Sequence, residues 1–175
     1  MRNREPGSSE AQGKFVRVSD YFAELYVAGR LADAGWNIYF PHRDQGFDFI
    51  ITKYPIGVPI IRPVQVKGKY PRSGTADKDA YGYTEELSEL HDEMVLAIPY
   101  FSSQNPSEPV CVAYMPRNQI KPTGRGWRCQ PATLRNGVPK PRRDYAKFFD
   151  SGGISLLEEL EWPDSSIETA EKWSP

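Results

Sequence analysis

Asp48, Gln65 and Lys67 are the residues of this sequence whose types and spacing could do chemistry. They lie in two short runs rich in β-branched and aromatic residues, 47–52 and 59–67, which are separated by a segment that contains Pro and Gly. Such runs around a turn predict a β-hairpin. Because side chains alternate along a strand, Gln65 and Lys67 share one face of the second strand, where Asp48 can meet them from the first strand.

Two interpretations fit these polar groups. Burying a carboxylate or an ammonium costs several kcal/mol of free energy unless the charge is paired or bound to a metal. In the first interpretation, Asp48 and Lys67 form a structural ion pair at the edge of the sheet, since such pairs are common. In the second, the three polar groups converge because they form a metal-dependent site.

The pattern of an acid in one strand and polar-x-Lys in the next resembles the PD-(D/E)XK phosphodiesterase superfamily. In that superfamily a hairpin presents Asp and then Glu-x-Lys around a divalent metal. Gln65-Val66-Lys67 resembles the Gln-x-Lys variant of Mrr-type restriction nucleases and intron-associated homing endonucleases. The resemblance covers about residues 15 to 115 and implies an α/β fold, with a restriction-endonuclease-like mixed central sheet flanked by helices and an αβββαβ-type core.

The resemblance also implies an activity, namely a metal-dependent DNA endonuclease that hydrolyses phosphodiester bonds. Asp48, the side chain of Gln65 and the carbonyl of Val66 would bind Mg²⁺, for which Mn²⁺ can substitute. Lys67 would orient the attacking water and stabilise charge on the phosphorus. Because Gln replaces the usual Glu, the site has one negative charge fewer, which should weaken its affinity for metal.

A glutamate on a helix before the hairpin is a recurrent feature of the superfamily. Glu24 occupies that place and would complete the catalytic set as an outer ligand or orienting residue. It can equally be an ordinary boundary residue that pairs with a neighbouring cation.

Helix and strand signals surround the hairpin in the order that the resemblance implies. We expect a helix from Ser19 to Gly35, strands over 37–40, 94–101 and 109–115, an acidic helix over 85–93, and short helices over 144–149 and 154–162 separated by Gly152-Gly153. Tyr21, Leu25, Ala28 and Ala32 form the apolar stripe of the first helix, with Leu31 and Glu24 toward one edge of it. Glu24 is therefore not expected on the outer face of the helix. Residues 95–98 are consecutively apolar, which predicts a buried central strand.

Basic residues are concentrated near the carboxyl end of the chain. Between 116 and 148 there are nine Lys and Arg against one acid, whereas 150–175 has seven acids against Lys172. Charge segregated in this way predicts a positive face for phosphates or, alternatively, a solvated basic loop without a partner. The residues expected to contact DNA are His42, Arg43, Lys69, Arg72, Arg125, Trp127, Arg128, Arg142 and Arg143. Trp127 suits stacking on an unpaired base, but it also suits the core of a strand over 126–130.

Length and composition limit the remaining possibilities. A chain of 175 residues that is 39% hydrophobic and 26% charged is typical of one globular domain. We expect a disordered arm at 1–14, a domain at 15–162 with its core at about 15–115 and a basic extension at 116–162, and an acidic tail at 163–175. No membrane span, signal peptide or nucleotide-binding motif is evident, so a cytoplasmic location without a nucleotide cofactor is expected. Two cysteines without metal-ligand spacing predict reduced thiols and no zinc site.

Two other functions remain open at this stage. The chain can be a catalytically inactive nucleic-acid-binding module of the same fold. It can also be a protein-interaction domain that uses its acidic tail against a basic partner. If the protein cuts both DNA strands, a homodimer is a common solution, but nothing in the sequence requires one.

Overall fold

The computed structural model describes residues 18–43, 46–55, 57–70, 91–102, 105, 107–124, 126–135 and 138–159. Its elements, in chain order, are α1 (Val18–Asp33), β1 (Asn37–Tyr39), β2 (Phe49–Lys53), β3 (Ile60–Val66), β4 (Val95–Phe101), β5 (Pro109–Pro116), the 3₁₀-helix η1 (Arg117–Gln119), β6 (Lys121–Thr123), β7 (Gly126–Arg128), β8 (Ala132–Arg135), β9 (Val138–Pro141), the 3₁₀-helix η2 (Arg143–Phe148) and α2 (Asp150–Leu156). The expected arm, the acidic tail and the expected helix at 85–93 apart from residues 91–93 lie outside the described residues.

A five-stranded mixed sheet forms the centre of this α/β fold, with the strand order β1-β2-β3-β4-β5. Neighbouring strands are antiparallel except for β3 and β4, which are parallel. The predicted hairpin is confirmed as β2 and β3, and the predicted central strand as β4, in which every residue is buried. Pro63 lies inside β3, but pairing with β4 starts only at Val64, so the missing N–H costs no bond on that side.

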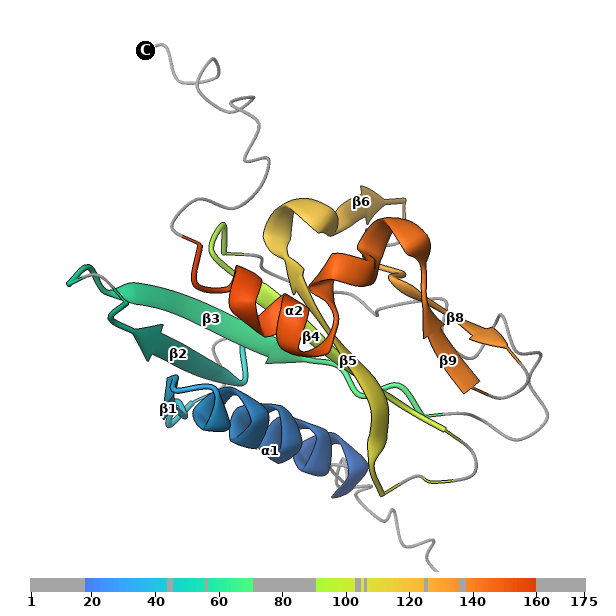
Figure 1. Ribbon diagram of the computed structural model, residues 1–175, viewed down its shortest axis with the longest axis horizontal. Helices are drawn as coiled ribbons and strands as arrows, with labels where there is room; N and C mark the ends of the chain where they lie inside the picture. The colour runs from blue at the N-terminus through green and yellow to red at the C-terminus, as the bar shows by residue number, and fades with distance from the viewer. Residues whose placement is uncertain are drawn as a thin grey trace, which may run out of the picture.

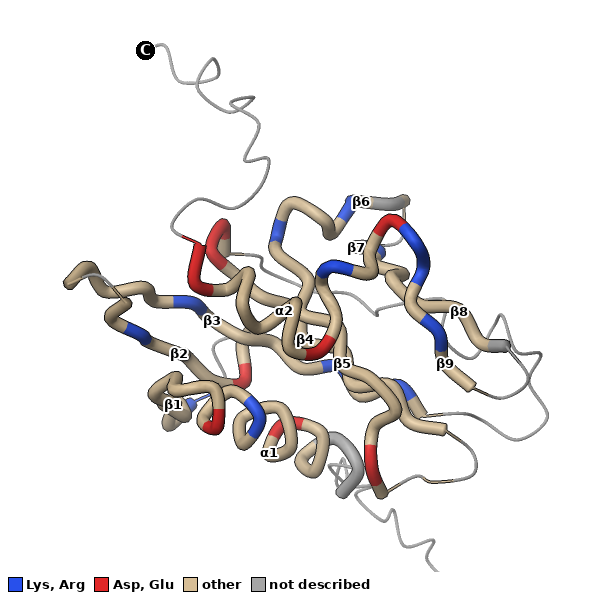
Figure 2. The backbone as a smooth tube through the Cα atoms, viewed as in Figure 1, with Lys and Arg blue, Asp and Glu red and all other residues tan. Residues whose placement is uncertain are grey.

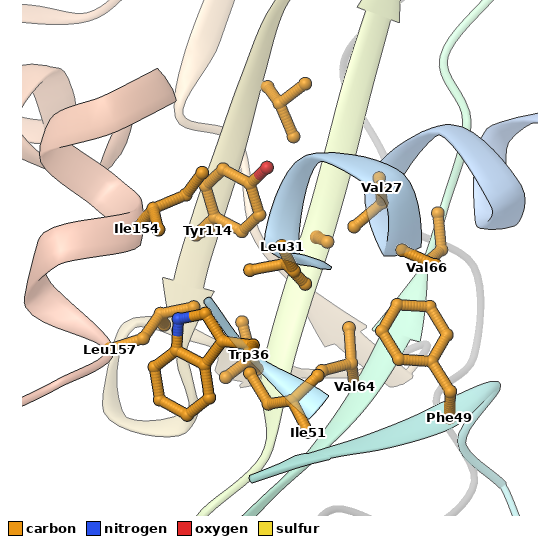
Figure 3. Close-up of a cluster of buried hydrophobic side chains, with 14 of the residues drawn as sticks. Val27, Leu31, Trp36, Phe49, Ile51, Val64, Val66, Tyr114, Ile154 and Leu157 are labelled. Carbon is orange, nitrogen blue, oxygen red and sulfur yellow. The ribbon is translucent and has the colours of Figure 1, made fainter. Parts of the chain in front are cut away.

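The two faces of the sheet are covered by different parts of the chain (Figure 1). Helices α1 and α2 cover one face, where Leu31 and Leu157 pack with Val64 and Tyr114 in the cluster shown in Figure 3. On the other face, the segment from η1 to η2 covers β4 and β5, and residues such as Ile120 pack with them there. The carboxyl-terminal extension therefore contributes to the core of the domain.

Helix α1 ends where the sequence predicts but buries a different stripe. Gly35 has φ of +85°, and the N–H of Trp36 donates to the carbonyl of Leu31, which is the glycine-dependent end that a left-handed residue allows. The buried stripe is Ala23, Val27 and Leu31.

The predicted stripe of α1 is wrong for three of its four members. Tyr21 is 57% exposed, Leu25 is 45% exposed and Ala32 is exposed, so that Ala28 alone is buried. Apolar residues occupy both sides of this helix, and periodicity cannot choose between them. The small side chain of Ala23 decides, because it lets α1 approach Gly68 closely: a Cβ on that glycine would lie 3.1 Å from the Ala23 Cβ.

Two cations of the hairpin bind the carboxyl ends of the helices. Arg62 is 2% exposed, and its Nε and Nη2 donate to the carbonyls of Leu157 and Glu159 at 3.1 and 2.6 Å, while Nη1 pairs with Glu93. Burial lowers the pKa of this guanidinium, and the Glu93 carboxylate opposes that shift. Cations are favourable at helix carboxyl ends because the last carbonyls lack intrahelical donors.

Lys53 makes the corresponding contacts beside α1. Its Nζ donates to the carbonyl of Ala34 at 2.8 Å and pairs with Glu158 at 2.5 Å. The two cations thus fix the hairpin to both helices at the end that is farther from Asp48.

The glycine pair near the carboxyl end does not separate two helices, contrary to prediction. Gly152 and Gly153 lie inside α2, and η2 precedes it over Arg143–Phe148. A Cβ at Gly153 would lie 2.2 Å from the Phe148 carbonyl oxygen and 3.0 Å from the Tyr114 ring. Gly153 is therefore required by close packing inside α2, and not by a break between two helices.

The two helical glycines give a matched pair of substitutions. Gly29 is exposed in the middle of α1, and a Cβ there would meet nothing within 4 Å. Gly29→Ala should raise the free energy of unfolding by about 0.5 to 1 kcal/mol, because alanine favours helix more than glycine does. Gly153→Ala should lower it by about 1 to 3 kcal/mol through the clash with Phe148. Urea unfolding measures both changes, and a stabilising Gly153→Ala would contradict the packing.

Arg62 gives a second test of the fold. Arg62→Met should lower the free energy of unfolding by about 2 to 4 kcal/mol, because it leaves the buried Leu157 carbonyl and the part-buried Glu159 carbonyl without their donor. Glu93→Gln should cost less than about 1 kcal/mol, since the Glu93 side chain is 46% exposed and water can replace its partner. Equal losses of unfolding free energy in the two variants would show that the ion pair with Glu93, and not the contacts with the carbonyls, stabilises the fold.

Candidate functional site

The structure brings Asp48 and Gln65 together at the end of the hairpin. Nε2 of Gln65 donates to Oδ2 of Asp48 at 2.9 Å, and the backbone N–H of Val66 donates to the same oxygen at 2.5 Å. Asp48 stands just before β2, and its own N–H donates to the Val64 carbonyl at 2.8 Å. Phe49 pairs with Val64 in the ladder, which places Asp48 opposite Gln65 on the face away from α1.

Lys67 lies next to this pair without joining it. Its side chain is half-buried, and alternation along the strand puts it on the same face as Gln65. Its backbone N–H donates to the Ala97 carbonyl at 2.9 Å. Among the described residues no ion pair joins Lys67 to Asp48, so the structural salt bridge that was one interpretation of the sequence is absent. The Asp48 carboxylate turns instead to the amide groups of residues 65 and 66.

The strand register maps the face that carries these residues. The row of Asp48 and Gln65 continues to Leu96 on β4, because Gln65 pairs with Leu96. The adjacent row runs from Tyr39 on β1 through Ile50 to Pro63. The site is therefore flanked by an apolar row towards the other end of the hairpin.

The oxygen donors of this corner suit a hard divalent cation. Asp48 offers a carboxylate and Gln65 an amide oxygen, which a half-turn of the amide would bring to where Nε2 now stands. The carbonyl of Val66 points to the same edge of β3 as its N–H, which already meets Asp48. Over the described part of the chain no group of three His, Cys, Asp or Glu side chains gathers, so a metal here would depend on one carboxylate and neutral oxygens. Mg²⁺ tolerates few protein ligands because it retains several waters.

Glu24 approaches the same end of β3 from the other side of the sheet. It is half-buried on α1, directly after Ala23, which packs close to Gly68. The prediction that Glu24 avoids the outer face of α1 is confirmed. Its part in a metal site stays a prediction, because Asp48 and Gln65 lie on the opposite face.

The residues expected to contact nucleic acid are placed unequally. His42 and Arg43 are exposed in the loop after β1, as the sequence suggests. The backbone of Lys69 forms a bridge with Tyr100, extending the contact between β3 and β4. Arg72 and Arg125 lie outside the described residues.

Trp127 is partly enclosed by its own chain. It lies in β7, within the strand that the sequence predicted, and it packs against the cluster that includes Ile120. The Arg117 guanidinium lies 4.3 Å above the ring centroid. That face of the indole cannot accept a base while Arg117 remains, so the packing favours a structural role. Nearby Arg128 is exposed and donates to Gln130 Oε1 at 2.6 Å.

The segment from β9 to η2 carries a concentration of positive charge, visible in Figure 2. Lys140, Arg142, Arg143 and Lys147 stand there against Asp144, the only acid among the described residues 138–148. We call these four residues the basic segment. The basic segment comes after β8 in the chain and belongs to the layer that covers the sheet face carrying Asp48. Phosphates bound to it would therefore lie on the same face of the sheet as the site.

Arg142 is the least solvated member of the basic segment. Its side chain is half-buried, and the side-chain Nε has no hydrogen-bond partner among the described groups. Its backbone N–H donates to the Pro131 carbonyl at 2.8 Å. Burial raises the pKa of Tyr100, and Arg142 opposes that rise, so the guanidinium lies within electrostatic reach of this hydroxyl. Tyr100 pairs with Lys69, two residues beyond Lys67. A half-buried guanidinium without a carboxylate partner is suited to an external anion.

The two cysteines lie in the core of the domain. Cys111 and Cys129 are buried, and neither forms a disulfide. Burial raises the pKa of each to about 12, so both are protonated at neutral pH.

No protein-family model matches the chain, and no curated protein matches it significantly. No described helix has the length and apolar character that crossing a membrane requires. The function must therefore be argued from the geometry of the site.

Sequence reasoning missed Arg62, Lys53 and Tyr39. Arg62 had a recognisable signal, because it shares its strand face with Val64 and Val66, where a charge is unexpected. Tyr39 had none before the register of β1 was known.

The basic segment predicts salt-dependent binding to DNA. Arg142→Ala combined with Arg143→Ala should lower the magnitude of the slope of log K against log salt by roughly 1.8 for duplex DNA, which is about 0.9 for each lost phosphate contact. Fluorescence anisotropy across a salt series measures the slope. Arg30→Ala is the control, because Arg30 is exposed on α1, on the other side of the sheet. An unchanged slope in the double variant would move phosphate binding away from η2.

Proposed function

We propose that this chain is a metal-dependent endonuclease that hydrolyses phosphodiester bonds in DNA. The observation that carries the proposal is the corner where the Gln65 amide and the Val66 N–H converge on the Asp48 carboxylate, with the half-buried Lys67 two residues after Gln65. The order of three antiparallel strands followed by a parallel one supports a restriction-endonuclease-like core, to which the sequence motif is similar.

Each residue of the corner has a chemical part in this proposal. Asp48, the Gln65 amide oxygen and the Val66 carbonyl would hold Mg²⁺. When bound, the metal would supply a Lewis acid for phosphate oxygens and lower the pKa of a bound water. Lys67 would hold a non-bridging phosphate oxygen and orient the attacking water, and the alternation of side chains along the strand supports its place on the face of Gln65. The basic segment would retain the DNA by its other phosphates.

A specific observation also favours a second candidate, an inactive DNA-binding module of the same fold. Gln65 presents its nitrogen to Asp48, so the carboxylate is satisfied by two N–H donors without any metal. A glutamate at position 65 could not do this. In the second candidate the basic segment binds DNA and the corner is only structural.

Gln65→Glu separates the two candidates. For the nuclease, a second carboxylate should tighten Mg²⁺ binding, so the melting temperature should rise on adding Mg²⁺ and activity should be retained or increase. For the binding module, the new carboxylate faces Asp48 without a cation, and stability should fall by about 1 to 3 kcal/mol with or without Mg²⁺. Thermal unfolding with and without Mg²⁺ measures both outcomes. A metal-independent loss would contradict the nuclease proposal.

Asp48→Asn and Lys67→Met test the chemistry directly. Nicking of a supercoiled plasmid in Mg²⁺ should fall below detection in both variants, while DNA binding persists. The reasons differ, because Asp48→Asn removes the metal's carboxylate and Lys67→Met removes a cation from the phosphate. Metal binding should therefore be lost only in Asp48→Asn. Wild-type nicking that is the same in Mg²⁺ and in EDTA would exclude a metal-dependent site.

A further inference from the structure

The sheet face beside Asp48 carries apolar residues that belong to neither of the two core clusters. Tyr39 pairs with Ile50, and Ile50 pairs with Pro63, one row away from Asp48 and Gln65. Ile61 lies one row farther, opposite Thr52. We call Tyr39, Ile50, Pro63 and Ile61 the apolar floor. Tyr39 is 55% exposed and Ile61 56% exposed, whereas Ile50 is half-buried and Pro63 is buried, so a ligand can reach the floor at its two ends.

Tyr39 stands close to the proposed scissile position. It lies directly opposite Ile50, which is two residues from Asp48 on the same face of β2. Diagonal neighbours of this kind have Cα atoms roughly 7 to 8 Å apart, still within reach of an aromatic side chain. A nucleotide whose phosphate lies at Asp48 could therefore place its own or the adjacent base over the Tyr39 ring.

The charges around the floor suit a phosphate backbone. His42 and Arg43 are exposed three and four residues after Tyr39, and Lys67 has no ion pair among the described groups. Within the described residues 37–43, 46–55 and 57–70, Asp48 is the only acid. Cations beside an exposed aromatic ring are the combination that binds single-stranded nucleic acid, because bases stack on the ring while phosphates meet the charges.

We propose that the apolar floor binds an unpaired base of the substrate by stacking on Tyr39, so that the site acts on DNA with a single-stranded segment at the scissile phosphate. The proposal rests on the nuclease function for the place of that phosphate. In an intact duplex both faces of each base are covered by its neighbours, and the floor would have no base to receive. Sheet faces with exposed aromatic residues recognise unpaired bases for this reason.

Binding without cleavage tests the inference. Fluorescein-labelled 20-nucleotide single strands and the corresponding duplex would be titrated in EDTA and followed by anisotropy. Tyr39→Ala should weaken binding of the single strand by roughly 5- to 150-fold, as loss of one base stack does, and leave duplex binding unchanged. Tyr39→Phe should bind as the wild type does, since the ring and not the hydroxyl makes the contact. Tyr54→Ala is the matched control, because Tyr54 is 63% exposed just after β2, at the end away from Asp48.

The outcomes distinguish failure of the inference from failure of the nuclease proposal. Equal effects of Tyr39→Ala and Tyr54→Ala, or an equal loss for duplex and single strand, would overturn the inference even if plasmid cleavage in Mg²⁺ is observed. Selective loss in Tyr39→Ala would support the base site even if no strand is cut, and the absence of cutting would then count against the nuclease alone. Unchanged melting temperatures in the three variants are expected, because both tyrosines are more than half exposed.

Discussion

The buried guanidinium of Arg62 is the interaction on which the remaining arrangement depends. It lies on the core face of β3, where a charge is unfavourable unless its donors are used. Its partners come from the carboxyl end of α2 and from Glu93, just before β4. One side chain therefore joins the hairpin to segments 31 or more residues away in the sequence. Hydrophobic packing alone would not specify this arrangement, because it is not directional.

The polar anchor determines how the site is presented. Arg62 and Lys53 fix one end of the hairpin to the helices, and Asp48 and Gln65 lie at the other end. A shift of the register by one residue would send Arg62 to the exposed face and Gln65 into the core. Loss of the Arg62 contacts thus opposes the same shift of register that would destroy the site. The anchor and the site share a strand but lie on opposite faces, so neither restricts the contacts of the other.

Sequence patterns predicted the parts of this fold that depend on local chemistry. The β2–β3 hairpin, the buried strand β4 and the end of α1 at Gly35 follow from alternation, consecutive apolar residues and a left-handed glycine. The convergence of Asp48 and Gln65 followed from the period of the strand. What failed depends on contacts between distant segments. The buried side of α1 is chosen by the approach of Ala23 to Gly68, and Gly153 packs against the ring of Tyr114 as well as against the neighbouring Phe148 carbonyl. A local pattern contains neither the contact with Gly68 nor the contact with Tyr114.

The choice of glutamine at position 65 links stability and chemistry at the site. With an amide there, Asp48 obtains two N–H donors from its own chain, so the corner is electrostatically satisfied before any cation arrives. A carboxylate in its place would need a cation to offset repulsion between like charges. Glutamine therefore separates folding from metal binding. In the proposed nuclease, a metal would have to compete with the hydrogen bond between Gln65 and Asp48, and a half-turn of the Gln65 amide would replace its N–H donor by an oxygen ligand.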